Sequence, residues 1–271
     1  MTIERSSRFD SGSELYLDLL KRCLINSIYE DPPISRGRKC GAGSEYKQAD
    51  RFTGRDWPSR AHTMIGFERL SNLQVLIRDL LARNVPGDLL EAGVWRGGAT
   101  VFMRGILKAH RAEGRVVWVA DSFRGFPPPR DVSEKSYTSA EFAIPTSERK
   151  SILGEMIQLQ RGASLEAVRA TFERYGLLDS CVRFLPGWFR ETLPAAPIER
   201  LALLRIDCDL YDSTLEVLQS LYPRVSPGGY IIVDDYNTFA ECRQAVHDYL
   251  KPSFDGTITP IDADAVFWCK V

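Results

Sequence analysis

The chain has 271 residues, of which 44% are hydrophobic and 26% charged, a composition typical of one globular α/β domain with extensions. Its 35 Lys and Arg residues almost balance its 36 Asp and Glu residues, so no overall field favours nucleic acid or an anionic membrane. No apolar run approaches the roughly 18 residues of a membrane span, and the first residues lack a signal-peptide pattern. We therefore expect a cytoplasmic protein with neither nucleic-acid nor membrane partners.

The first predicted element is an amphipathic helix over residues 13–28, where leucine and isoleucine recur at helical spacing. Residues 34–56 contain many glycine, arginine and serine residues and few large apolar ones, which predicts a loop or mobile lid. Helical periodicity returns over residues 66–82. These patterns divide the chain into an N-terminal helix and lid, residues 1–62, and a larger domain, residues 63–271, whose function is inferred from the motifs below.

Short apolar runs separated by helix-length segments then predict a parallel sheet with helices on both faces. Two β-rich runs at the end of the chain are too close together for a helical crossover and should form an antiparallel hairpin. The expected fold is a Rossmann-like, seven-stranded, mostly parallel sheet of the class I methyltransferase type. The runs are residues 89–92, 116–120, 182–185, 201–206, 230–233, 257–261 and 265–271.

One segment interrupts this alternation between the second and third strands. Residues 126–162 contain a cluster of prolines, many charges and weak periodicity. A segment of this length in a compact domain is usually functional. We expect a partly helical insertion near the mouth of the site.

A glycine-rich turn, Glu-Ala-Gly-Val-Trp-Arg-Gly-Gly at residues 91–98, follows the first core strand and precedes a helix. Glu91 stands at the first glycine position of the dinucleotide fingerprint, where an acid suits the ammonium and sulfonium of S-adenosylmethionine better than a pyrophosphate. Asp121, at the end of the second strand, can accept hydrogen bonds from ribose hydroxyls. The alternative for both acids is a structural pairing with an arginine such as Arg96 or Arg124.

Two acid clusters follow the fourth and fifth strands: Asp207 and Asp209 after one, Asp234 and Asp235 after the other. Because the carboxyl ends of adjacent parallel strands meet at one edge of a sheet, these side chains should converge. Carboxylates gathered at one place repel each other unless a cation neutralises them, and Mg²⁺ is the natural candidate. The alternative is a set of solvated acids or helix caps.

Taken together, these motifs resemble the macrocin O-methyltransferase (TylF-type) family, which methylates hydroxyl groups of deoxysugars and related acceptors in antibiotic biosynthesis. The resemblance covers most of the chain. The segments that carry it are residues 63–66, 90–98, 120–123, 184–189 and 227–236.

The resemblance implies that Asp207, Asp234 and Asp235 ligate Mg²⁺ and that S-adenosylmethionine donates the methyl group, leaving S-adenosylhomocysteine. The family usually has glycine where this chain has Cys208, which could slightly reshape the turn behind the metal. The residues expected to hold the cofactor are Thr63, Met64, Glu91, Gly93, Trp95, Gly97, Asp121, Ser122 and Gly187.

The group that removes the acceptor's proton is less clear from sequence. In related catechol methyltransferases a lysine three residues after the first metal aspartate takes the proton, but this chain has Leu210 there. Asp207 is therefore our first candidate for the proton acceptor, and Asp209 is the second. The three histidines, His62, His110 and His247, are expected to be structural or solvated.

The expected function is Mg²⁺-dependent methylation of a deoxysugar hydroxyl on a glycosylated natural product, by a homo-oligomeric enzyme. One alternative is the same chemistry on a phenolic, peptide or amino-acid-derived hydroxyl. Another is a non-catalytic relative that keeps the fold, although the intact acids argue against it.

Overall fold

A computed structural model of the chain describes residues 11–34, 45–112, 114–128, 131–136, 163–251 and 254–271. Its centre is a seven-stranded sheet with the order β3-β2-β1-β4-β5-β7-β6. The first five strands are parallel, and β7 runs antiparallel to both β5 and β6. The strands are β1 (Asp88–Ala92), β2 (Val117–Asp121), β3 (Val182–Pro186), β4 (Leu201–Ile206), β5 (Val225–Val233), β6 (Thr259–Pro260) and β7 (Val266–Cys269).

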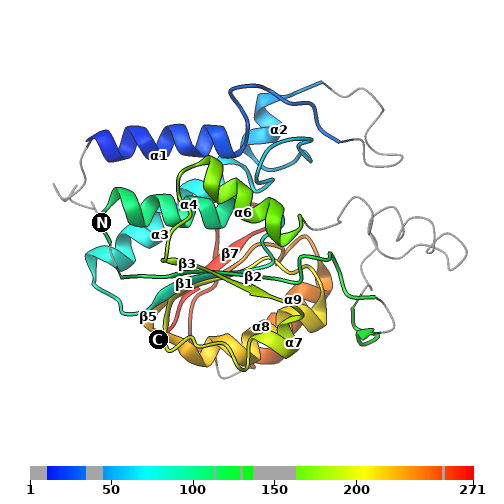
Figure 1. Ribbon diagram of the computed structural model, residues 1–271. Coiled ribbons are helices and arrows are strands. Elements are labelled where there is room, and N and C mark those ends of the chain that lie inside the picture. Colours follow the sequence, from blue (N-terminus) through cyan, green and yellow to red (C-terminus); the bar gives the residue numbers. More distant parts are fainter. Residues whose placement is uncertain (1–10, 35–44, 113, 129–130, 137–162, 252–253) are drawn as a thin grey trace, which may run out of the picture.

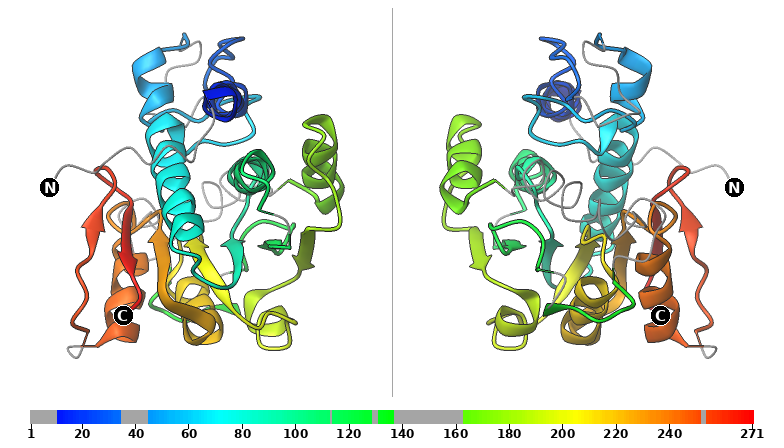
Figure 2. Two further views of the ribbon diagram at one scale, coloured as in Figure 1. Left: turned by 90° about the vertical axis from the view of Figure 1, so that its left-hand side faces the viewer. Right: turned by 90° about the vertical axis from the view of Figure 1, so that its right-hand side faces the viewer.

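Helices cover both faces of this sheet, as Figures 1 and 2 show. One face carries α3 (Gly66–Ala82), α4 (Gly98–Ala109) and α6 (Leu165–Arg174). The opposite face carries α7 (Phe189–Thr192), α8 (Tyr211–Leu221) and α9 (Ala240–Leu250), and the short 3₁₀ helix Tyr222–Arg224 leads into β5. The predicted doubly wound methyltransferase fold is confirmed.

Two apolar cores flank the sheet because successive strand residues point to opposite faces. Leu89 is buried in the core that includes residues of α1, α3 and α4, whereas Leu90 is buried in the core formed with α8 and α9. A strand with a core on each side is mostly apolar along its length, and β1 and β4 follow that pattern apart from Asp88 and Glu91 in β1 and Arg205 in β4. This explains why the strands read as continuous apolar runs in the sequence.

The N-terminal segment adds a layer outside α3 and α4. Helix α1 (Ser11–Leu24) is shorter than the predicted helix, and its residues Leu17, Leu20 and Leu24 are buried in the core that contains α4. Within the expected loop 34–56 lies a short helix, α2 (Gln48–Phe52), which the sequence pattern does not predict. Residues 35–44, the centre of the expected lid, lie outside the described residues.

A buried ion network helps to hold α2 in place, together with the stacking of Phe52 on Phe67. The side chain of Arg51 is 1% exposed and donates hydrogen bonds to the carboxylates of Asp31 and Asp56. It also donates to the main-chain oxygens of Ile25 and Asp31. Hydrophobic periodicity does not report a buried ion network of this kind, and the helix is therefore not predicted from the sequence.

The C-terminal hairpin is confirmed, with strands shorter than the predicted runs. Of the expected insertion 126–162, only residues 126–128 and 131–136 are described; the rest lies outside the described residues. Residues 131–136 are joined to the start of α8, because Ser133 and Ser136 both donate to Asp212. No helix in the described part of the chain is both long enough and apolar enough to cross a membrane.

Candidate active site

A cavity of about 430 Å³ lies at the carboxyl ends of the parallel strands, within the size range of small-molecule sites. Eight of the nine predicted cofactor residues line it: Thr63, Met64, Glu91, Gly93, Trp95, Asp121, Ser122 and Gly187. The acids Asp207, Asp209, Asp234 and Asp235 line it as well. The cofactor and metal predictions therefore fall on one cavity.

The glycine-rich turn passes very close to the end of β4. Gly93 has a φ of +83°, and a Cβ atom added there would lie 1.8 Å from the main-chain oxygen of Asp207. Only glycine fits this approach. Gly97, the ninth predicted residue, does not line the cavity; with a φ of +82° it caps α4 and faces Val168. Its position shapes the turn.

Glu91 is buried at the floor of the cavity and is held by Arg205. The two residues stand opposite each other on β1 and β4, and Arg205 donates a short hydrogen bond to Glu91 Oε1. Glu91 Oε2 is buried without a hydrogen-bond partner among the described residues. Burial raises the pKa of Glu91 to about 8, and the carboxylates of Asp207 and Asp234 add to the shift, although Arg205 opposes it.

Arg205 is a residue that the sequence does not reveal, and neither Arg96 nor Arg124 pairs with Glu91. The Arg205 guanidinium also donates to Asp207 Oδ2, at 2.7 Å, and to Asp234 Oδ1. One fully buried cation thus contacts three acids. The only signal in the sequence is a lone charged residue inside an otherwise apolar strand.

Asp121 differs from Glu91 in being satisfied by the backbone. Its Oδ2 accepts a hydrogen bond from the Val94 N–H at 2.8 Å, and its Oδ1 accepts one from the Phe123 N–H at 2.7 Å. Burial raises its pKa, while these hydrogen bonds oppose the shift. Asp121 therefore fixes the glycine-rich turn and also faces the cavity, where a ribose contact stays a prediction.

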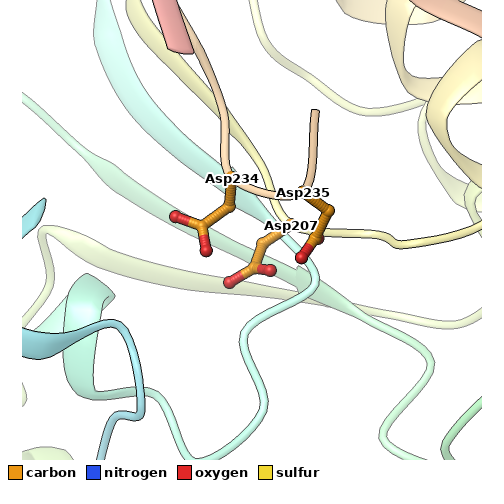
Figure 3. Close-up of side chains that lie close together, drawn as sticks. All are labelled: Asp207, Asp234 and Asp235. Carbon is orange, nitrogen blue, oxygen red and sulfur yellow. The ribbon is translucent and has the colours of Figure 1, made fainter. Parts of the chain in front are cut away.

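Asp207, Asp234 and Asp235 converge at the ends of β4 and β5, as Figure 3 shows. Each offers one carboxylate oxygen, and these atoms all lie within 4.8 Å of one another. Asp235 Oδ2 is buried and has no hydrogen-bond partner among the described residues. Burial, with the neighbouring carboxylates of Asp209, Asp207 and Asp234, raises the pKa of Asp235 well above its usual value. An all-oxygen set with an unpartnered buried oxygen fits a hard divalent cation.

Two arginines already neutralise part of this acid cluster. Arg205 contacts Asp207 and Asp234, and Arg69 contacts Asp234 from the first turn of α3. The sequence argument, which names Mg²⁺ as the natural neutralising cation, does not include these two arginines. Within the described part of the chain, Asp235 forms no ion pair with an arginine, so it is the acid with the strongest need for a further cation.

The candidates for the proton acceptor can now be placed. Leu210 is completely buried in the core, so this position contributes no polar group to the cavity. Asp209 lines the cavity beside the three-acid cluster and has a left-handed φ of 57°, a conformation that is strained for a residue other than glycine. Cys208, between the two acids, is buried with its thiol directed at the main-chain oxygen of Ala92. With cysteine at this position, Asp207 and Asp209 both still line the cavity.

The histidines lie elsewhere. None of the three is among the residues that line the described cavity. His62 Nδ1 is 2.9 Å from the Tyr175 hydroxyl, and His247 Nε2 is 2.6 Å from the Tyr236 hydroxyl. Burial lowers the pKa of His62, with help from Arg174 and Arg96. These contacts agree with the expected structural role.

The position of Trp188 directly after the third predicted strand predicts that it borders the adenine of the cofactor or belongs to the core, but most of the remaining apolar wall is not predicted from the sequence. Trp188, which follows β3, lines the cavity and belongs to neither core. Besides Trp95 in the glycine-rich turn, the other aromatic lining residues come from four separate segments: Trp57, Phe126, Phe189 and Phe239. No single motif links them, so only the fold could bring them together.

Comparisons with known proteins agree with this geometry. Residues 13–270 match the family described as macrocin-O-methyltransferase (TylF). The chain is 48% identical to demethyldecarbamoylnovobiocin O-methyltransferase of Streptomyces niveus, over 98% of this chain and 97% of the relative. It is 47% identical to mycinamicin III 3''-O-methyltransferase of Micromonospora griseorubida, over 95% of this chain and 97% of the relative.

Solved structures show the same fold. The structure of the O-methyltransferase NovP superposes with a TM-score of 0.82 at 47% identity, covering 96% of this chain and 99% of that chain. The calicheamicin methyltransferase CalS11, at 21% identity and a TM-score of 0.53, shares the fold over 75% of this chain and 79% of its own.

Proposed function

Since the chain belongs to the macrocin-O-methyltransferase (TylF) family and is therefore an S-adenosylmethionine-dependent O-methyltransferase, we propose that it methylates a sugar hydroxyl of a glycosylated natural product with the help of a divalent cation. The relatives named above include enzymes for novobiocin and mycinamicin intermediates. The observation that carries the metal part is the unpartnered, buried Asp235 Oδ2 within a cluster of three acids beside the cofactor cavity, in the described part of the chain.

The cofactor would occupy the part of the cavity between the glycine-rich turn and the start of α3. Asp121 and Ser122 line this part at the end of β2, where carboxylate and hydroxyl oxygens suit a ribose. Glu91 lines the floor, and its Oε2, unpartnered among the described residues, suits the ammonium group of the methionine moiety. Thr63 and Met64, just before α3, would border the same end.

Asp207, Asp234 and Asp235 would hold the cation, with Mg²⁺ as the candidate. A bound divalent cation lowers the pKa of a coordinated hydroxyl and fixes its position for in-line attack on the methyl group. The protein's own contribution is to hold these three carboxylates together, and burial with the neighbouring acids raises the pKa of Asp235 well above its usual value.

Asp209 is the better proton acceptor of the two candidates. Asp207 accepts a hydrogen bond from Arg205 at 2.7 Å, and an adjacent guanidinium makes a carboxylate a weaker base. Asp209 is outside the three-acid cluster yet lines the same cavity, so it can take a proton from an acceptor without leaving a ligand position. This reverses the order that the sequence suggests.

The acceptor would bind against the aromatic wall. Trp57, Phe126 and Phe239 line the cavity, and flat apolar side chains of this kind suit the rings of a sugar and its aglycone. A glycoside acceptor is supported by the relatives, and the phenolic or peptide hydroxyl remains the competing acceptor class.

The test begins with calorimetric titration of S-adenosylmethionine and S-adenosylhomocysteine into the purified protein. A panel of glycosides, phenols and hydroxyl-bearing peptides is then assayed by mass spectrometry with Mg²⁺ and with EDTA. We expect the mass gain of one methyl group on a glycoside, abolished by EDTA and restored by Mg²⁺. Turnover restricted to phenols or peptides would contradict the sugar acceptor, and turnover unaffected by EDTA would contradict the metal.

A further inference from the structure

Arg69 extends from the first turn of α3 to the wall of the cavity, where its side chain is 10% exposed. It contacts three acids from two different parts of the chain. Nη1 donates to Asp234 Oδ2 at 2.5 Å, Nε donates to Asp262 Oδ2 at 2.6 Å, and Nη2 donates to Asp264 Oδ2 at 3.2 Å. The role of Asp234 as a metal ligand belongs to the proposed function, on which the following argument rests.

Asp262 provides a fixed anchor for this guanidinium. It lies in the turn between β6 and β7, and its Oδ1 accepts hydrogen bonds from the N–H groups of Asp264 and Ala265, at 2.9 and 2.8 Å. Its Oδ2 is left for Arg69 Nε. Asp262 itself is not among the cavity-lining residues, so its contact with Arg69 serves no direct ligand role.

Asp234 is the acid whose orientation depends on this anchor. Its Oδ2 accepts from Arg69 and its Oδ1 accepts from Arg205, so both oxygens are held. Its main-chain N–H donates to the Ile206 oxygen at 2.9 Å, which fixes the backbone as well. Asp235, the next residue, lacks a comparable arginine contact and keeps one oxygen unpartnered among the described residues. Of these two adjacent acids, Asp234 has both carboxylate oxygens fixed by arginines, whereas Asp235 keeps one oxygen without a partner among the described residues.

We propose that Arg69 is a positioning residue of the metal site: anchored by Asp262 at the tip of the β6–β7 hairpin, it sets the orientation of the Asp234 carboxylate for a divalent cation. The planar fork of the guanidinium makes this possible, because separate N–H groups point at Asp262 and Asp234 at fixed angles. A lysine ammonium could keep the charge but would lose this geometry.

This role connects three elements that are distant in the sequence. Thr63 and Met64, which line the cavity, stand immediately before α3, and Arg69 belongs to the first turn of that helix. The antiparallel hairpin, at the edge of the sheet, then becomes part of the metal site through Asp262. A partner that orients a metal ligand commonly changes metal affinity by about 10–100-fold when it is removed.

The test uses Mn²⁺ as the metal probe, with free Mn²⁺ followed by electron paramagnetic resonance in the absence of any acceptor. We expect Arg69→Lys, Arg69→Gln and Asp262→Asn each to weaken Mn²⁺ binding by about 10-fold or more. Asp262→Asn is the sharpest of the three, because asparagine Oδ1 can keep the turn contacts while Nδ2 would face Arg69. Arg83→Lys, which alters an ion pair at the far end of α3, is the matched control and should bind Mn²⁺ as the unsubstituted protein does.

The outcomes separate this proposal from the proposed function. If the unsubstituted protein binds Mn²⁺ and the Arg69 variants bind it equally well, the positioning role is wrong while the metal function stands. Tighter binding by Arg69→Gln would also overturn it, since Arg69 would then act as a competing cation. If the unsubstituted protein binds no Mn²⁺, both proposals fail. Circular dichroism and S-adenosylhomocysteine titration check each variant's fold, and Asp262→Asn decides the matter should the Arg69 variants not fold.

Discussion

Asp121, at the end of β2, and the acids at the ends of β4 and β5 are held in different ways, and Glu91 resembles the latter because Arg205 holds it. On the cofactor side, Asp121 is satisfied by the N–H groups of Val94 and Phe123, so its carboxylate stabilises a local turn. On the metal side, Asp207 and Asp234 are held by arginines, and Asp235 keeps a buried oxygen that is unpartnered among the described residues. The backbone N–H groups oppose the rise that burial causes in the pKa of Asp121, whereas Asp207 and Asp234 depend on arginine side chains. The difference indicates where a ligand must bring positive charge.

The largest expected effect comes from Gly93, where the glycine-rich turn passes close to the main chain of Asp207. Gly93→Ala would place a methyl group against the Asp207 main-chain oxygen at a left-handed φ, so we expect destabilisation of about 3 kcal/mol or more and loss of both cofactor and metal binding. Urea unfolding and calorimetry measure this. Gly176→Ala is the control, because that glycine has a φ of +64° but nothing within 4 Å of the added Cβ. It should cost only about 1 kcal/mol, and equal losses at both sites would contradict the close approach.

Asp235→Asn should affect the proposed metal site and leave cofactor binding largely unchanged. An asparagine keeps the size of the side chain and removes the charge, so we expect methyl transfer to fall by about two orders of magnitude, with S-adenosylhomocysteine affinity changed less than about threefold. Turnover and calorimetric titration of one preparation give both numbers. A variant with full activity in Mg²⁺ would show that Asp235 is not a ligand.

Asp121→Asn should give the opposite pattern. Its amide nitrogen would face one of the backbone N–H groups that now donate to the carboxylate, which disturbs the turn and the ribose side of the cavity. We expect S-adenosylhomocysteine affinity to fall by about 10-fold, the scale of one hydrogen bond to a charged group, with Mn²⁺ affinity unchanged. A loss of Mn²⁺ affinity as large as the loss of cofactor affinity would mean that the two sides do not act separately.

The smallest effect is a pH dependence of the metal-free protein. The pKa of Glu91 is raised to about 8 in the folded state, so folded Glu91 holds a proton that the unfolded chain has lost, and stability must fall as pH rises through 8. Between pH 7 and 8.5 in EDTA, we expect the free energy of unfolding to drop by roughly 1 kcal/mol. Urea titrations at both pH values measure the drop. Glu91→Gln should remove this slope, and an unchanged slope in that variant would assign it to other groups.

The parts of the fold that depend on apolar periodicity are predictable from the sequence. The helix over 66–82 and the β4 run 201–206 coincide with the observed elements, because each buries a regular apolar face or a continuous apolar strand. The convergence of Asp207, Asp234 and Asp235 follows as well, because the carboxyl ends of adjacent parallel strands meet at one edge of the sheet. Features that arise from apolar burial and strand order can therefore be predicted from local sequence patterns.

The parts that depend on buried charge are not predictable in this way. Arg51, Arg69 and Arg205 each bring together acids from separate segments, and the first of these contacts helps to hold α2 in place. An arginine in a sequence reads as a solvated residue unless the register that places it beside an acid is known. The same limit applies to the aromatic wall, whose members come from segments that only the folded chain makes adjacent.

The contacts of Arg205 have a consequence for how this protein can change over evolutionary time. Because one buried guanidinium serves Glu91, Asp207 and Asp234, replacing Arg205 alone would leave three acids without this cation. The effects of substitutions in this group should therefore be strongly non-additive, a case of epistasis in which single steps are harmful and joint ones less so. We therefore expect this group of residues to change little and to change together.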